Sequence, residues 1–289
     1  VINALEIRPG EILSFGSPDQ QSRVADGVTE DTFLGFKATP GEMITISAGF
    51  DATGDDVPDS SLVVVSPDGI CYERVKPEDA AEIVEKTVIE QEVIERLLYV
   101  DPKTEEKVPL EKDIPFYSRQ TRVLLAGNML VDSTTIGDYI AIGGYQALAK
   151  VLAEMSPEDV ISEVRKSGLR GRGGAGFSTA TKWEACRQTP GTPKYLICNA
   201  DEGDPGAYMD RSVLEGNPHS VLEGMLIGAY AIGAQQAFVY VRAEYPLAIE
   251  HLGIAIEQAR EHGLIGDDIL GSGFDFDVTI SRGAGAFVC

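Results

Sequence analysis

Glycines and basic residues gather in one stretch of the chain, GLRGRGGAGFSTATKW, which spans residues 168–183. Glycine permits a positive φ and lets a ligand approach the backbone with no Cβ in the way. Successive free N–H groups bind anions, and Arg170, Arg172 and Lys182 add charge that suits phosphate. We interpret the stretch as a phosphate cradle; the alternative is a surface loop whose basic residues serve solubility. The glycines of the cradle would be Gly171, Gly173, Gly174 and Gly176.

Two familiar phosphate-binding motifs do not describe this stretch. A Walker loop would read G-x-x-x-x-G-K-[ST], and no Lys follows a glycine pair at that spacing here. A Rossmann fingerprint opens a helix directly after a strand, whereas these glycines follow a predicted helix and precede a predicted strand. The interpretation therefore depends on the chemistry of glycine and of positive charge.

A second polar segment, NADEGDPGAYMDR, covers residues 199–211 and comes directly after the apolar run KYLIC. Amide and carboxylate oxygens are acceptors for the hydroxyls of a ribityl or ribose chain. They are also ligands for a hard cation such as Mg²⁺, and a solvated acidic turn is a third interpretation. The acceptor side chains are Asn199, Asp201, Glu202, Asp204 and Asp210.

Other kinds of catalytic chemistry find no motif in this chain. The sequence contains neither G-x-S-x-G nor H-E-x-x-H, so a hydrolase is not supported. The four cysteines are far apart and form no C-x-x-C pair, which argues against a locally ligated zinc ion or cluster and against a disulfide framework. We therefore assign no catalytic side chain and no metal ligand, and we expect a reducing, cytoplasmic location.

The elements that position the two polar segments alternate between strand and helix. Residues 194–199, 237–242 and 275–280 read as strands, and residues 217–234 and 246–263 read as helices between them. This β-α-β-α-β order predicts an α/β fold with a mainly parallel sheet covered by helices. Ligands of such sheets bind at the carboxyl ends of the strands, where the segment 199–211 begins.

Upstream signals predict further elements. Ser156-Pro157-Glu158-Asp159 is typical of a helix start, and Gly168 can end that helix. Residues 136–152 read as one helix that contains the pair Gly143-Gly144. Residues 62–75 read as a β-hairpin, followed by an amphipathic helix over 77–98 that is interrupted near Ile89. Alternation within 39–50 suggests a strand.

Composition limits the partners of the chain. It has 289 residues, 43% of them hydrophobic, with a net charge of −22 and a pI near 4.4. A surface this acidic repels phosphate backbones, so nucleic acid is not an expected partner. The apolar runs are far shorter than the ~18 residues that span a bilayer, so we expect no transmembrane segment.

Several motifs in a fixed order identify a resemblance. GLRGRGGAGF, YLICNADEGDPGAYMDR, AYAIGA, FVYVRAEYP and GAGAFVC resemble the flavin- and NADH-binding subunit of respiratory complex I. The same module occurs in NAD(P)-reducing and electron-bifurcating hydrogenases and in NAD-dependent formate dehydrogenases. The resemblance runs from about Leu62 to Cys289 and is dense from Ser156 onward.

The resemblance implies FMN bound in a Rossmann-like domain, with NAD(P)H stacked on the flavin. Arg172 and Lys182 would supply charge for the FMN phosphate. The other implied FMN contacts are Gly171, Gly173, Gly174, Asn199, Asp201 and Glu202.

The same resemblance implies contacts to the nicotinamide nucleotide. Phe177 would face the adenine side, and Asp204 would lie at the nicotinamide end, where complex I members usually carry Glu. Phe287 occupies a place where many relatives have Tyr, beside the nicotinamide. Hydride exchange between stacked rings needs position and electrostatics rather than a side-chain base.

The resemblance also implies an organisation and an assembly. Residues 1–61 stay unassigned, residues 62–118 resemble the end of a thioredoxin-like domain with a connector, and residues 119–289 form an FMN/NAD(P)H-binding domain that is incomplete at its C-terminus. A [4Fe–4S] cluster is expected only in a missing C-terminal part. The partners would be the iron–sulfur subunits of a multi-subunit redox complex. A non-catalytic, cluster-less scaffold protein of such an assembly is the alternative.

Overall fold

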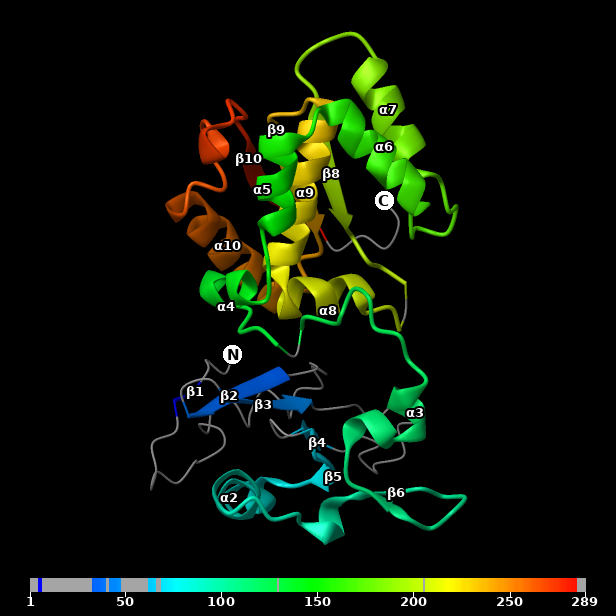
Figure 1. Ribbon diagram of the computed structural model, residues 1–289, viewed down its shortest axis with the longest axis vertical. Helices are drawn as coiled ribbons and strands as arrows, with labels where there is room; N and C mark the ends of the chain where they lie inside the picture. The colour runs from blue at the N-terminus through cyan, green and yellow to red at the C-terminus, as the bar shows by residue number, and fades with distance from the viewer. Residues whose placement is uncertain are drawn as a thin grey trace. The chain divides into compact units, whose positions relative to one another are not determined.

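The computed structural model divides the chain into two compact units, Val1–Arg122 and Val123–Cys289, which we describe separately (Figure 1). In the part of the chain that the structure describes, no helix is both long enough and apolar enough to cross a bilayer. The described residues are 5–6, 33–39, 42–47, 62–65, 69–128, 130–204 and 206–284.

The first unit contains a five-stranded sheet in the order β1-β2-β3-β4-β5. The β4–β5 hairpin predicted for residues 62–75 is confirmed, with Val65 opposite Cys71, and so is a strand within residues 39–50. Three strands of this sheet come from residues 1–61, for which the sequence predicted no fold. The resemblance of residues 62–98 to a thioredoxin-like domain stays a prediction. The strands are Leu5–Glu6, Phe33–Thr39, Glu42–Ser47, Leu62–Val65 and Cys71–Val75.

The helical segment after β5 ends at Ile89, which confirms the interruption predicted there. It comprises η1 (Pro77–Asp79), α2 (Ala80–Glu82) and η2 (Ile83–Ile89). The predicted continuation toward residue 98 is wrong, because the hydroxyl of Tyr72 in β5 accepts the backbone N–H of Ile94 at 3.0 Å. A tertiary hydrogen bond thus replaces the helical one. The remaining elements of this unit are η3 (Glu95–Leu97), β6 (Tyr99–Val100), β7 (Lys107–Val108), η4 (Glu111–Asp113) and α3 (Pro115–Ser118).

The second unit is built on a parallel three-stranded sheet in the order β10-β9-β8. The helices α9 and α10 connect successive strands, so the β-α-β-α-β prediction is confirmed. Strand β9 lies in the middle, with Tyr195 of β8 and Asp277 of β10 both paired to Gln236. The elements are β8 (Tyr195–Ala200), α9 (Pro218–Ile232), β9 (Gln236–Val241), α10 (Pro246–Glu261) and β10 (Asp277–Arg282).

The two faces of this sheet differ in the described residues. Inward side chains of the middle strand, such as Val239 and Val241, are fully buried against the core that includes Leu222 and Leu226 of α9. On the other face Ile197 is 67% exposed, and Tyr195, Phe238 and Tyr240 are exposed as well. A parallel sheet is normally covered on both faces. Within the described residues, only one face of this sheet is covered.

The predicted helix over residues 136–152 is in fact two helices, α4 (Ile136–Ala141) and α5 (Gln146–Glu154). The chain turns between them at Gly143, which has a φ of +95°, and at Tyr145, which has a φ of +62°. A Cβ on Gly144 would lie only 2.1 Å from the ring of Tyr139. The glycine pair therefore serves a sharp turn and a close contact rather than a helix interior.

A buried carboxylate holds this turn in place. Glu223 of α9 accepts the Tyr139 hydroxyl at 2.6 Å, the Tyr145 N–H at 2.9 Å and the Leu148 N–H at 3.0 Å. It thereby satisfies backbone donors at the start of α5 that have no intrahelical partner. His219 lies one helical turn earlier in α9 and contacts the Tyr145 hydroxyl at 2.8 Å. Burial lowers the pKa of His219, which keeps the imidazole neutral.

The helix predicted to start at Ser156 is confirmed as α6 (Pro157–Ser167). Ser156 and Asp159 form a reciprocal capping box, and Gly168 ends the helix with a φ of +69°. The next helix is α7 (Thr179–Gln188). The sequence did not predict α7, α8 (Met209–Gly216) or the short η5 (Ile269–Gly271).

We predict that Glu223→Gln lowers the free energy of unfolding by about 1–3 kcal/mol, because an amide NH₂ would then face donors that need an acceptor. The matched control is Glu257→Gln, the same change on an exposed residue of α10. Urea unfolding of the full chain, followed by circular dichroism, measures both. Equal midpoints for the two variants would contradict the role of Glu223.

Candidate functional site

The glycine loop, residues 168–178, is closed at its base by its own backbone. The Gly171 N–H donates to the Phe177 carbonyl at 2.8 Å, and the Thr179 N–H donates to the Leu169 carbonyl at 3.1 Å. The guanidinium of Arg170 donates to the Gly176 carbonyl at 2.8 Å. Arg170 therefore stabilises the loop, and part of its hydrogen-bonding capacity is used within the loop.

The tip of the loop presents bare backbone to its surroundings. Added Cβ atoms on Gly173, Gly174 and Gly176 would meet no heavy atom within 4 Å. Gly174 and Gly176 have φ values of +96° and +60°, which only glycine adopts readily. A Cβ on Gly171 would lie 3.7 Å from the Phe177 carbonyl, an ordinary contact. A ligand can thus approach this backbone closely.

Positive potential accumulates where the loop runs into α7. Ser178 caps the helix by accepting the Thr181 N–H at 3.4 Å, and the positive end of the α7 helix dipole faces the loop. Lys182 lies in this turn and is exposed, as is Arg172 in the loop. Neither has a carboxylate within ion-pair distance among the described residues. Such a helix start is suited to an anion.

The acid loop, residues 199–204, continues directly from β8. The Asn199 side chain accepts the Asp201 N–H at 3.2 Å, and the Glu202 carboxylate accepts the Arg211 N–H at 3.1 Å. The Tyr245 hydroxyl donates to the Glu202 carbonyl at 3.1 Å. Two of the predicted acceptors, Asn199 and Glu202, therefore also shape the loop that carries them.

Carboxylates crowd together around this loop. Burial, and then the charge of Glu202, raise the pKa of Asp210. Burial, followed by the charge of Asp210, raises the pKa of the Cys198 thiol to about 11. That thiol is therefore protonated at neutral pH, as expected for a small apolar residue rather than a nucleophile.

Arg242 offsets part of this negative charge. The sequence motifs did not identify it as a site residue. It follows β9 directly, and its Nη2 donates to Glu244 at 2.7 Å while its Nη1 lies 3.8 Å from the Asp201 carboxylate. Arg211 also belongs to this cluster, with an ion pair to Glu215 at 2.9 Å. The available sequence signal was the position of Arg242 at the end of a predicted strand.

The topology places the glycine loop and the acid loop at the same end of the sheet. Helix α7 leads into β8, so the start of the helix lies level with the end of the strand. Trp183 of α7 and Leu196 of β8 both approach Gly228 of α9, where an added Cβ would be 3.1 Å from each. In Figure 1 the α6–α7 loop lies toward the same end as the head of the β8 arrow.

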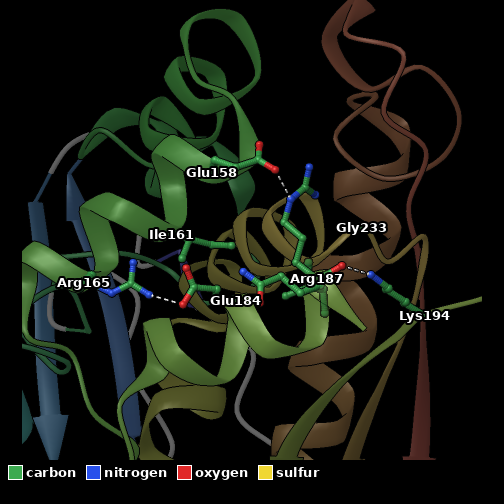
Figure 2. Close-up of a pocket in the computed structure, with 9 residues that line it drawn as sticks. Glu158, Ile161, Arg165, Glu184, Arg187, Lys194 and Gly233 are labelled. Atoms are coloured by element: carbon green, nitrogen blue, oxygen red, sulfur yellow. Dashed lines mark hydrogen bonds and ion pairs between the residues drawn. The ribbon is translucent and has the colours of Figure 1, made fainter. Parts of the chain in front are cut away.

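A hollow of about 470 Å³, shown in Figure 2, lies toward the opposite end of β8. Lys194, just before the strand, donates to the Arg187 carbonyl at 2.6 Å. Arg187 pairs with Glu158 at 2.6 Å, and Arg165 pairs with Glu184 at 2.8 Å. Both arginines of the hollow are thus paired within the protein, and the amino end of a parallel sheet is not where ligands bind.

Other predicted site residues are placed as follows. Phe177 is 54% exposed at the end of the glycine loop, and Asp204 is exposed in the acid loop. Phe287 lies outside the described residues. Among the described residues, no group of three His, Cys, Asp or Glu side chains is arranged to hold a metal ion.

Comparison with known proteins finds a family for this part of the chain. Residues 164–289 match the model of the Nuo51 FMN-binding domain. The match begins near the end of α6 and includes both the glycine loop and the acid loop.

Two curated relatives and one solved structure illustrate the similarity. The chain is 57% identical over 171 residues to the NADP-reducing hydrogenase subunit HndC of Solidesulfovibrio fructosivorans, covering 59% of this chain and 34% of that protein. It is 50% identical over 167 residues to the F 2 subunit of NADH-quinone oxidoreductase from Rhizobium meliloti (strain 1021), covering 58% of this chain and 40% of that protein. The chain thus matches well under half the length of these relatives. A chain of the H2-reduced NAD+-reducing [NiFe]-hydrogenase aligns with 27% identity and a TM-score of 0.47, over 80% of this chain and 34% of that one.

We predict different effects on stability for two neighbouring alanine substitutions. Gly174→Ala lowers the free energy of unfolding by about 1–2 kcal/mol, because alanine is strained at a φ of +96°. Gly173→Ala leaves it unchanged or slightly raised, because its Cβ enters open space and the unfolded chain loses freedom. Thermal unfolding of the full chain checks this contrast, and an equal loss for both variants would contradict the loop geometry.

Proposed function

Since residues 164–289 match the model of the Nuo51 FMN-binding domain, we propose that this chain is the FMN- and NAD(P)H-binding part of an NADH dehydrogenase-type flavoprotein. Its activity is hydride exchange between a nicotinamide nucleotide and FMN. The observation that carries the proposal is the open backbone of the glycine loop beside Lys182 at the start of α7.

The glycine loop fits the phosphate end of FMN. The backbone of Gly173 and Gly174 lies open to a ligand above Gly171 at the base of the loop, and a side chain at the loop tip would fill the space that the cofactor needs. Arg172 and Lys182 add positive charge beside the start of α7. Backbone donors and a flexible ammonium together suit a phosphate that carries two negative charges.

The acid loop fits the middle of the same cofactor. Asn199, Asp201 and Glu202 offer oxygen acceptors at the carboxyl end of β8, and a ribityl chain offers hydroxyl donors. A cofactor that reaches along this edge would have its phosphate at the glycine loop and its polyol chain at the acid loop. This match favours a flavin mononucleotide over the Mg²⁺ ion and the solvated turn that the sequence left open.

The nicotinamide nucleotide would bind on the exposed side of the flavin. Phe177 presents a half-exposed ring for the adenine, and Asp204 is exposed near the expected nicotinamide end. We place Phe287 beside the nicotinamide as part of the same proposal. The side chains position the two ring systems, and none is needed as a general base.

When bound, FMN supplies a ring that accepts a hydride and returns electrons singly to other centres. The named relatives are subunits of a hydrogenase and of a quinone oxidoreductase. We therefore propose that the partners are iron–sulfur subunits of a cytoplasmic multi-subunit complex. The cysteines of a [4Fe–4S] site would belong to polypeptide outside the segment that matches these relatives.

We predict that Lys182→Ala weakens FMN binding about tenfold, the cost of one exposed charge-assisted contact, and that Gly173→Ala weakens it at least as much. Lys166→Ala is the matched control, because this exposed lysine of α6 pairs with Glu163 outside the loop. Quenching of FMN fluorescence by the full chain measures each affinity. Equal affinities for all four proteins would remove the glycine loop from the site.

A second measurement separates an enzyme from a scaffold. Anaerobic NADH or NADPH should bleach the flavin absorbance of the FMN-loaded chain. Bound FMN that neither nucleotide bleaches would favour the alternative of a non-catalytic docking protein.

A further inference from the structure

Arg242 has an unusual environment for an arginine at the end of a strand. Its side chain is 13% exposed, and its Nη1 is buried with no hydrogen-bond partner among the described residues. An unpaired buried donor costs free energy, and native structures rarely keep one without a reason. The other branch of the guanidinium is fixed by Glu244 at 2.7 Å.

This Nη1 forms an ion pair with the Asp201 carboxylate, at a distance of 3.8 Å. Ala200 and Val241 are paired across β8 and β9, so Asp201 and Arg242 are the next residues along two neighbouring strands. Their side chains therefore meet at the carboxyl edge of the sheet, where the acid loop begins. The separation is too long for a hydrogen bond, so the oxygens of Asp201 remain available to another donor.

An exposed arginine pair of this unit lacks these features. Arg260 pairs with Asp277 at 2.6 Å, with side chains 48% and 61% exposed, at the first residue of β10. Exposed pairs of this kind contribute little. Arg242 instead lies within a crowded group of carboxylates, where a fixed cation offsets the repulsion between like charges.

We propose that Arg242 is a positioning residue for the flavin: anchored by Glu244, it holds the Asp201 carboxylate where that group accepts a ribityl hydroxyl. The inference rests on the proposed function and extends it to a residue outside the glycine and acid loops. Removal of Arg242 leaves Asp201 beside Glu202 with less compensating charge, and the acceptor is no longer held in place.

A double-mutant cycle tests this role through FMN affinity, measured by fluorescence quenching with the full chain. Arg242→Gln and Asp201→Asn should each weaken binding about tenfold, the usual size of coupling between contacting charged residues. If Arg242 acts through Asp201, the double variant binds FMN no more weakly than Asp201→Asn alone. Independent effects that multiply to about a hundredfold would overturn the proposal, as would unchanged affinity in Arg242→Gln.

Two further variants keep the result interpretable. Arg242→Lys retains the charge but not the two-branched geometry, so it should restore part of the affinity; it also replaces Arg242→Gln in the cycle if that variant does not fold. Arg260→Gln removes the exposed arginine at the other end of the sheet and should bind FMN normally. A comparable loss in Arg260→Gln would show a general effect of charge and overturn the specific role of Arg242.

The outcome also distinguishes this inference from the proposed function. If the unaltered chain binds no FMN, the proposed function fails. If it binds FMN and Lys182→Ala weakens that binding while Arg242→Gln does not, the positioning role alone fails.

Discussion

Parallel pairing of β8, β9 and β10 brings the carboxyl ends of three strands to one edge of a sheet. Helix α7 leads directly into β8 and runs back along it, so α7 starts where β8 ends. The start of α7 and the glycine loop before it therefore share an edge with the acid loop. Backbone direction alone thus brings an anion-binding helix start and a row of acceptors to one place, and it separates both from the hollow at the amino end.

Electrostatics at this edge has two opposite parts. The glycine loop and the start of α7 carry positive charge on Arg172 and Lys182, whereas carboxylates concentrate in and beside the acid loop, where burial raises the pKa of Asp210. A mononucleotide with an anionic end and a hydroxyl-rich middle matches this polarity. In our proposal, Arg242 limits the repulsion between the carboxylates of the acid loop and holds Asp201 in place.

Stability and binding place different demands on the same backbone. The glycine loop stays open because its tip lacks side chains, and it keeps its form through hydrogen bonds at the base, including that from Arg170 to Gly176. The rigid support comes from elsewhere: α9 is almost wholly buried, and its Glu223 fixes the turn that starts α5. A well-packed helix layer thus holds an exposed backbone surface in place.

Part of the structure could be predicted from local signals in the sequence. These are the Ser156 capping box, the alternation of strands and helices, the freedom of glycine and the acceptors after a strand. They predicted the α/β sheet and both loops of the site. Only tertiary structure decided the break before α5, where Glu223 binds the Tyr145 N–H from 78 positions away, and the hydrogen bond to Tyr72 that takes the place of a helical one at Ile94. The contact between Asp201 and Arg242 likewise required the register of β8 and β9. Local patterns encode hydrogen bonds between near neighbours, whereas these contacts join distant segments that become neighbours only when the chain is folded.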